Sequence, residues 1–477
     1  MAQRITTKKF ATNVIVSITA QIISLAVSVI LNLVVPKIID EYQYAYWQVY
    51  VLYAGYVGIL HFGLLDGLVL RYSKYDYEEL ERARLRSQFK ILLFFTSAVT
   101  LIMATVSAFA VGGEYKYILI LVAAAVITKN MVTYSSYMFQ ITNRISKYAI
   151  LTIAQRLTYG LTVVILLVCK VNNFYWYCIA DLIGDAIGIV IGFIFNRGLY
   201  FGKSLKIKDA FKEMKDNISS GILLMLANWS ALLIVGGAKM IIQWRWDELV
   251  FGKVSFAFSV SNLFLVFITA ISVVLFPSLK RIEEDKLPQM YKNIRGILSP
   301  LLFICMLFYF LGSWILNMWL PKYSDSLVYL GVLLPIIIYS SKVSLLTNNY
   351  LKVFRKEKIM LIVNLISIAL GAVAFTLSAY VFNNLFAVLI SVVGVIMFNS
   401  ILSEICVLRV IKVKIIKDFI LEIIMTVGFI LAASLLNLWM GCLVYAGLFA
   451  LYCAVNYKSI ITTCKLIFNR KKGVKEE

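Results

Sequence analysis

The sequence is poor in charged residues, and in acidic ones above all. Only 15% of its 477 residues are charged, with 25 Asp and Glu against 46 Lys and Arg, whereas 61% are apolar. Globular domains average about 25% charged and about 45–50% apolar residues. This composition excludes a soluble enzyme, a disordered chain and a nucleic-acid-binding factor, and it indicates a polytopic membrane protein.

Residues for metal and nucleophile chemistry are also scarce. The chain has one histidine, His61, so a histidine-based metal site cannot form. Its seven cysteines lie scattered in apolar segments without CxxC spacing, which is typical of small buried side chains. No P-loop, GxSxG or HExxH motif is present. We therefore expect a protein that is not an enzyme and that needs no cofactor.

What the sequence has in abundance is long apolar runs. About 20 apolar residues suffice for a helix to cross the ~30 Å hydrocarbon core, whereas barrel strands would alternate over about 10 residues. The runs are continuous, so we predict an all-α protein with fourteen transmembrane helices. The predicted spans are residues 11–35, 44–70, 91–112, 117–140, 148–169, 173–196, 218–242, 250–277, 296–319, 326–350, 359–381, 385–408, 418–437 and 439–457.

The basic residues alternate between the two ends of these spans. Thirty-six Lys and Arg lie in the N-terminal segment, the tail and the loops that follow even-numbered spans, against five in the opposite loops. Because cytoplasmic loops retain positive charge, we predict that both termini are cytoplasmic. The opposite loops are short and hold only scattered acidic residues, which argues against a membrane polymerase or ligase. The long basic loops 71–90, 197–217 and 278–295 are amphipathic, and we expect them to rest on anionic lipid.

The two halves of the chain resemble each other weakly. FATNVIVSITAQ (10–21) can be aligned with KDNISSGILLM (215–225), and two later pairs of segments keep the same order. Such a repeat predicts two six-helix lobes related by an axis along the membrane normal. We predict an N-lobe over 1–197, a cytoplasmic linker over 198–217, a C-lobe over 218–410, and two further helices with a basic cytoplasmic tail over 411–477.

Polar residues follow one face of the first span. They recur every three or four residues, at Asn13, Ser17, Gln21, Ser24, Ser28 and Asn32. Unpaired polar groups are costly in lipid, so this face must meet protein or water. Close helix packing accounts for serines but hardly for Asn and Gln. In the seventh span Asn217, Asn228 and Lys239 share a face, and we expect both faces to line a water-filled cavity.

Several cations lie inside the predicted spans, where each costs about 2.5–3.5 kcal/mol on insertion scales. The deep ones are Lys129, Arg156 and Lys342, whereas Lys239 and Lys253 lie near the outer span ends and can snorkel. Arg156 could form a structural ion pair with Asp185. Lys129 and Lys342 have no obvious partner nearby in the sequence, which favours a functional role. A cationic cavity suits an anionic substrate, since Arg binds phosphate in a bidentate manner and Lys as a point charge.

The segment YAYWQVYVLYAGYVGILHFGLLDGLVLRYSKYDYEEL (44–80) resembles the second helix and following loop of bacterial polysaccharide exporters. With the TKKFATN start and the two lobes, the chain resembles the O-antigen and capsular polysaccharide flippases (Wzx-type) of the multidrug/oligosaccharidyl-lipid/polysaccharide (MOP) exporter superfamily. The resemblance implies a MATE-like fold in the bacterial cytoplasmic membrane. It also implies that an undecaprenyl-pyrophosphate-linked oligosaccharide crosses from the inner to the outer leaflet as the lobes rock.

This resemblance suggests roles for the intramembrane residues. We hypothesise that Lys129, Arg156 and Lys342 hold the pyrophosphate, with Lys239 and Lys253 assisting on the outward side. Sugar hydroxyls would bind the polar faces, represented by Gln21, Asn32 and Asn228. Asp66 and Asp185 are the candidates for coupling to a proton or Na⁺, or for a latch between helices.

The expected partners are the lipid-linked oligosaccharide, membrane lipids, a polysaccharide polymerase and other assembly proteins, and not nucleic acid. The alternatives are a teichoic-acid or peptidoglycan-precursor flippase and a cation-coupled multidrug exporter of the same superfamily.

Overall fold

The computed structural model describes residues 19–279, 283–413 and 415–457, although the side chains of 266–278 and 416 stay outside the description. These residues form helices and no strand. Twelve helices are long and apolar enough to cross a membrane, and two bent helix pairs bring the number of spans to fourteen. The predicted all-α architecture with fourteen spans is confirmed, and the chain is a multi-pass membrane protein.

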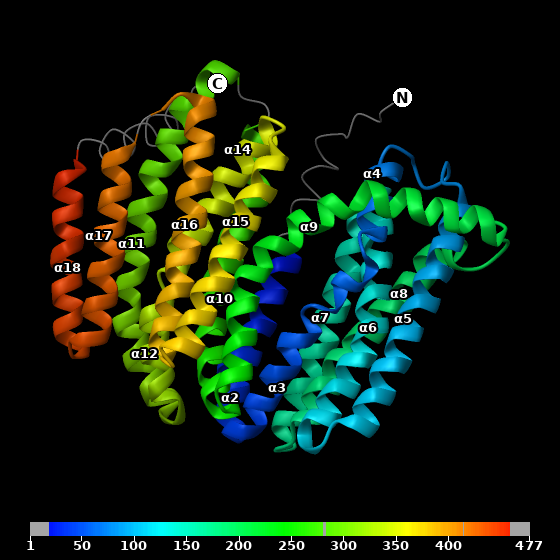
Figure 1. Ribbon diagram of the computed structural model, residues 1–477, viewed down its shortest axis with the longest axis horizontal. Coiled ribbons are helices and arrows are strands. Elements are labelled where there is room, and N and C mark those ends of the chain that lie inside the picture. The colour runs from blue at the N-terminus through cyan, green and yellow to red at the C-terminus, as the bar shows by residue number, and fades with distance from the viewer. Residues whose placement is uncertain (1–18, 280–282, 414, 458–477) are drawn as a thin grey trace. The chain divides into compact units, whose positions relative to one another are not determined.

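The chain divides into two compact units (Figure 1). Unit 1 runs through Leu232 and includes Trp246–Gly252. Its helices are the span Thr19–Ile38, then α3 (Glu41–Ala54), η2 (Val57–His61), α4 (Leu64–Tyr72), α5 (Arg82–Ala110), α6 (Gly113–Ile141), α7 (Ile145–Val168), α8 (Phe174–Tyr200) and most of α9 (Ile207–Arg245).

Unit 2 comprises Leu233–Arg245 and the residues from Lys253 onward. Its helices are most of α10 (Glu248–Leu279), then α11 (Leu287–Trp319), α12 (Ser324–Leu333), α13 (Ile336–Lys342), α14 (Asn348–Val353), α15 (Glu357–Thr376), α16 (Leu385–Ile411), α17 (Ile416–Leu435) and α18 (Leu438–Val455). The π-helical turn η5 (Val343–Thr347) joins α13 to α14. The predicted lobe boundaries stay a prediction, and residues from Ile207 of the predicted linker belong to α9.

The second span is bent by 54° between η2 and α4. Phe62 and Gly63 at the bend are left-handed, with φ of 48° and 81°. Beyond the bend, α4 touches α9 backbone to backbone. A Cβ at Gly67 would lie 1.9 Å from the carbonyl oxygen of Asn217, and one at Gly221 would lie 2.1 Å from that of Gly63. Glycine is therefore required on both helices, because no side chain fits between them.

Replacing Gly221 with Ala should separate α4 from α9. We expect a loss of about 1–3 kcal/mol in the free energy of unfolding, as for other overpacked contacts. Gly237→Ala on the same helix is the matched control, since nothing lies within 4 Å of its added Cβ. It should be neutral or stabilising by up to ~1 kcal/mol through helix propensity. Thermal unfolding of both purified variants measures the difference, and equal midpoints would contradict the tight contact.

The first turns of α9 lie across the ends of α5, α6 and α8 (Figure 1). The side-chain amide of Gln88 in α5 donates to the carbonyl of Ala210 (3.1 Å), and Met214 packs on the apolar core of unit 1. The opposite face exposes Ile207 and Phe211, at 77% and 53%, among exposed lysines. This segment is amphipathic, as the sequence predicts, and its contact with anionic lipid stays a prediction.

Candidate functional site

A row of glycines on α8 brings α6 and α7 close to it. Gly184, Gly188 and Gly192 recur every four residues and so share a face. A Cβ at Gly184 would lie 2.9 Å from the carbonyl oxygen of Gln155 in α7, and one at Gly192 would lie 2.3 Å from Oγ of Ser135 in α6. Small residues of this kind let transmembrane helices approach closely. The polar side chains of α6, α7 and α8 beside this row therefore lie close to one another.

Those side chains form a charged centre inside unit 1. The ammonium group of Lys129 in α6 lies 2.8 Å from Oδ2 of Asp181 and 3.4 Å from Oδ2 of Asp185, both in α8. The two aspartates are four residues apart and therefore face the same way. Lys129 thus has two acidic partners, contributed by a helix more than fifty residues away in the sequence.

Three neutral side chains complete the arrangement. Asp185 accepts hydrogen bonds from Thr128 (2.9 Å) and from the Gln155 amide (2.7 Å), and Asp181 accepts one from the Tyr50 hydroxyl (3.0 Å). We call this set the Lys129 centre; it consists of Tyr50, Thr128, Lys129, Gln155, Asp181 and Asp185.

The Lys129 centre carries one more negative than positive charge. Asp185 has no exposed side-chain surface, whereas the side chains of Asp181 and Lys129 are 18% and 26% exposed. Buried charges persist only when they are paired and hydrogen-bonded. The centre can therefore hold α3, α6, α7 and α8 together.

The alternative that Arg156 forms a structural ion pair with Asp185 is not seen among the described residues, where Asp185 pairs with Lys129 instead. Gln155 faces Asp185, and the next residue of a helix is rotated by about 100°. Arg156 is exposed and has no ion pair among the residues that the structure describes. It lies one turn before Gly160, whose added Cβ would be 2.8 Å from Val27 in the first span. Arg156 thus emerges near the first span.

Some of the polar side chains on one face of the first span form hydrogen bonds with the backbone of their own helix. Gln21 is exposed, while Ser28 donates to the carbonyl of Ser24 and the Asn32 amide donates to the carbonyl of Ser28, both at 2.8 Å. Backbone-directed bonds of this kind lower the cost of polar groups within a helix. Asn13 and Ser17 lie outside the described residues. The predicted sugar-binding role of Gln21 and Asn32 stays a prediction.

Asp66 is buried at the bend of the second span. It lies in the first turn of α4, where the helix dipole favours a carboxylate. Its Oδ2 is 3.7 Å from Nε2 of His61, whose Nδ1 accepts a hydrogen bond from the backbone of Gly63 (3.1 Å). Asn228 in α9 belongs to the electrostatic surroundings of Asp66. Asp66 therefore lies where the two arms of the bent span meet and where α9 packs on α4, a geometry that suits a latch.

Unit 2 contains a second group of charges, which is buried except at its rim. The Lys342 ammonium group lies 2.5 Å from Glu404 and 2.5 Å from Glu422. Arg295 reaches the same two carboxylates, at 2.7 Å each. Tyr291 donates to Glu404 (2.7 Å). We call this set the Lys342 network; it consists of Tyr291, Arg295, Lys342, Glu404, Glu422 and, at its rim, Asp418, 3.1 Å from Arg295.

The Lys342 network joins four helices, namely α11, α13, α16 and α17. The side chains of Lys342 and Glu404 are 0% exposed, and that of Arg295 is 6% exposed. In this structure Lys342 is thus closed off by its two glutamates. It would have to break both pairs before it could contact a substrate headgroup.

The remaining predicted cations lie elsewhere in unit 2. Lys253 in α10 forms an ion pair with Asp325 (2.6 Å), and the Lys239 ammonium group lies 5.9 Å from the ring centre of Phe258. Neither lysine contacts a residue of the Lys342 network among the described residues.

Sequence reasoning missed the roles of two residues here. Arg295 was counted among the loop cations because lysines precede it, and Glu422 follows a predicted loop in an otherwise apolar run. A charged residue at the edge of a span, with apolar residues on both sides, is the signal that could have found them.

The described residues form a multi-pass membrane protein with charged centres inside its spans. The structure is similar to "Lipid II flippase MurJ, inward closed conformation", with a TM-score of 0.68 and 12% identity over 94% of this chain and 100% of that chain. It is also similar to an inward-facing MATE family multidrug resistance transporter of the MOP superfamily, with a TM-score of 0.63 and 13% identity over 82% and 98% of the two chains. A MOP superfamily transporter from Pyrococcus furiosus matches with a TM-score of 0.55 and 12% identity, over 84% of this chain and 95% of that one.

At such identities these likenesses concern the fold. No curated protein matches the sequence. Residues 10–283, more than half of the chain, match the family of polysaccharide biosynthesis proteins, and the chain belongs to this family. The resemblance predicted from the sequence is confirmed at the level of family and fold.

Proposed function

We propose that this transporter moves an undecaprenyl-pyrophosphate-linked oligosaccharide, the repeat unit of an O-antigen or capsule, across the bacterial cytoplasmic membrane. The observation that carries the proposal is the family match over residues 10–283. Transport runs from the inner to the outer leaflet by alternating access, with both termini in the cytoplasm, as the distribution of basic residues favours. A polysaccharide polymerase and other assembly proteins receive the product.

Within this proposal the mid-span cations bind the diphosphate. Arg156 is exposed and without an ion pair in the described part of the chain, so its guanidinium group is ready for bidentate phosphate binding. Lys129 reaches the same headgroup when it leaves Asp181 and Asp185, and those carboxylates then take up a proton or Na⁺. Gln21, Asn32 and Asn228 bind sugar hydroxyls, and Lys239 and Lys253 assist on the outward side. We assign Lys342 to the stability of unit 2 because both its neighbours are buried carboxylates.

The function is tested by complementation. A bacterial strain that lacks its own repeat-unit flippase should regain surface glycan when it expresses this chain together with the matching glycosyltransferases. Accumulation of the lipid-linked repeat unit inside the cell should fall at the same time. Unchanged surface glycan despite normal membrane insertion would contradict the proposal.

A second candidate is a flippase for peptidoglycan or teichoic-acid precursors. The likeness to MurJ favours it, because it extends over 94% of this chain and the whole of that one. Rescue of a strain depleted of its lipid II flippase would support this candidate. The MATE-like fold also allows drug export, which an efflux assay in the same strains measures separately.

Arg156→Gln should reduce glycan export at least about tenfold, the effect of losing one charge-assisted hydrogen bond. Because Arg156 is exposed and has no ion pair in the described residues, stability should change by no more than about 0.5 kcal/mol. Arg409→Gln, at an exposed site at the end of α16, is the matched control and should export normally. Normal export by Arg156→Gln would remove this residue from the mechanism.

A further inference from the structure

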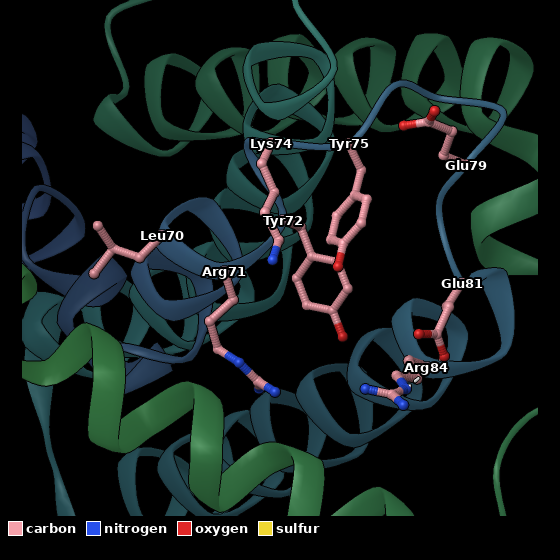
Figure 2. Close-up of a pocket in the computed structure, with 8 residues that line it drawn as sticks. All are labelled: Leu70, Arg71, Tyr72, Lys74, Tyr75, Glu79, Glu81 and Arg84. Carbon is pink, nitrogen blue, oxygen red and sulfur yellow. Dashed lines mark ion pairs between the residues drawn. The ribbon is translucent and has the colours of Figure 1, made fainter. Parts of the chain in front are cut away.

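A cavity of about 340 Å³ lies at the end of α4 in unit 1, separate from the Lys129 centre. It is open to the surface and bordered by the loop 73–81 and the first turn of α5, and Figure 2 shows its lining residues: Leu70, Arg71, Tyr72, Lys74, Tyr75, Glu79, Glu81 and Arg84. Sites for small ligands span about 300–1,000 Å³. This cavity therefore has room for a lipid headgroup and not for an oligosaccharide.

A buried glutamate holds two arginines at the cavity wall. Oε1 of Glu213 in α9 lies 2.6 Å from Nη1 of Arg71 and accepts the Tyr72 hydroxyl (2.8 Å), while its Oε2 lies 3.6 Å from Arg84. Nη1 of Arg71 also donates to Asn217 (2.5 Å). These contacts use one nitrogen of Arg71, and its Nε and Nη2 have no partner among the described residues. The guanidinium group is thus fixed in place with two donors to spare.

Lys74 adds a cation whose charge is not neutralised locally. Its ammonium group lies 5.0 Å from the ring centre of Tyr75 and forms no ion pair within the described ranges. Figure 2 shows the ends of Arg71 and Lys74 on one side of the Tyr72 ring and the two wall carboxylates, Glu79 and Glu81, on the other. One wall thus carries Arg71 and Lys74 with Glu213 behind them, a net positive charge, and the other carries Glu79 and the Glu81–Arg84 pair, a net negative charge.

Each wall carboxylate has one oxygen to offer a ligand. Oε2 of Glu79 accepts the backbone N–H of Asp76 (3.0 Å), and Oε2 of Glu81 lies 2.6 Å from Nε of Arg84. The Oε1 atoms of both glutamates have no partner in the described part of the chain. A donor group on a ligand can therefore bind to either of them.

The charges around the cavity sum to zero. Three basic lining residues are offset by the two wall glutamates and by Glu213 behind them. A diphosphate would bring several negative charges without compensation, whereas a ligand with one separated charge of each sign matches both walls. Leu70 on the rim is 52% exposed at the end of a membrane span, where lipid headgroups lie.

We propose that this cavity binds the phosphoethanolamine headgroup of a bilayer lipid. The phosphate accepts hydrogen bonds from Arg71 and Lys74, and the primary ammonium group donates to Glu79, the wall carboxylate that has no ion pair among the described residues. A quaternary ammonium group has no N–H to donate, and an anionic headgroup without an amine leaves Glu79 unpaired. The site therefore selects ethanolamine lipids over choline and glycerol lipids, and it does so independently of the transported substrate.

The test is a binding titration of the full-length purified protein with short-chain phosphatidylethanolamine, phosphatidylcholine and phosphatidylglycerol, and with inorganic phosphate. Phosphatidylethanolamine should bind about tenfold more tightly than the other three, the effect of one charge-assisted hydrogen bond. Glu79→Gln keeps an oxygen for the Asp76 backbone and should abolish the preference over phosphatidylcholine. Lys74→Gln should weaken the binding of both phosphatidylethanolamine and phosphatidylcholine. Neither residue supports the packing of a helix, so both variants should fold.

The exposed pair Glu283 and Lys286, 2.5 Å apart, provides matched controls. Glu283→Gln and Lys286→Gln should bind all four probes as the unaltered protein does. Equal binding of ethanolamine and choline lipids would overturn the proposal, as would a preference that survives Glu79→Gln. Tighter binding of phosphatidylglycerol or free phosphate would show a simple anion site instead. None of these outcomes depends on glycan export, so the proposal can fail while the proposed function stands.

Discussion

Lys342→Met should destabilise unit 2 by about 3–5 kcal/mol, the cost of removing one partner from a buried ion pair. The substitution leaves Glu404 and Glu422 with Arg295 as their one remaining basic neighbour among the described residues, in a place where none of the three has appreciable solvent exposure. Unfolding of the purified protein in mixed micelles, followed by tryptophan fluorescence, measures the loss.

The matched control for Lys342 is Lys286→Met. Its pair with Glu283 has the same 2.5 Å separation, but the two side chains are 67% and 70% exposed, so the change should cost about 0–1 kcal/mol. The double variant Lys342→Met/Glu404→Gln restores the charge balance and should recover part of the stability. If Lys342→Met unfolds like the control, the network does not stabilise unit 2.

Lys129→Met should abolish glycan export and lower the stability of unit 1. Asp181 and Asp185 would face each other without the cation that now lies within 3.4 Å of both. We expect a cost of about 2–3 kcal/mol, below the range for fully buried pairs, because the Lys129 side chain is 26% exposed. Surface-glycan labelling and thermal unfolding measure the two effects.

A second substitution separates the structural from the transport role of Lys129. Lys129→Met/Asp181→Asn leaves Asp185 bonded to Thr128 and Gln155 and should regain stability. Export should remain absent, because the ammonium group itself is needed for the diphosphate. Full export by the double variant would show that Lys129 acts only by neutralising the aspartates.

The sequence was sufficient to predict the spans. Their apolar runs and the alternation of basic loops are local patterns, and they predicted fourteen crossings together with the superfamily fold. The pairing of intramembrane charges was not predictable in the same way. Lys129 meets Asp181 across 52 residues and Lys342 meets Glu422 across 80, and such contacts depend on how each helix is rotated about its axis. Arg156 illustrates the point, since a rotation of about 100° from Gln155 separates it from Asp185.

The orientation of charged side chains at the ends of the spans was also not predictable from the sequence. Arg71 and Arg295 adjoin basic loops and so contributed to the topology count, yet both side chains turn toward buried glutamates. Hydropathy places a residue along the membrane normal, but it does not show whether the side chain faces lipid, water or protein.

The two C-terminal helices lie outside the predicted internal repeat, and the first of them, α17, is joined electrostatically to the rest of unit 2. Glu422 in α17 supplies one of the two carboxylates that neutralise Arg295 and Lys342. A shortened chain that ended after α16 would retain both cations with Glu404 as the single buried anion left to them in the described part of unit 2. A twelve-helix variant of this protein would therefore have to lose one of these cations together with α17 and α18. The two C-terminal helices cannot be removed without a compensating substitution in unit 2.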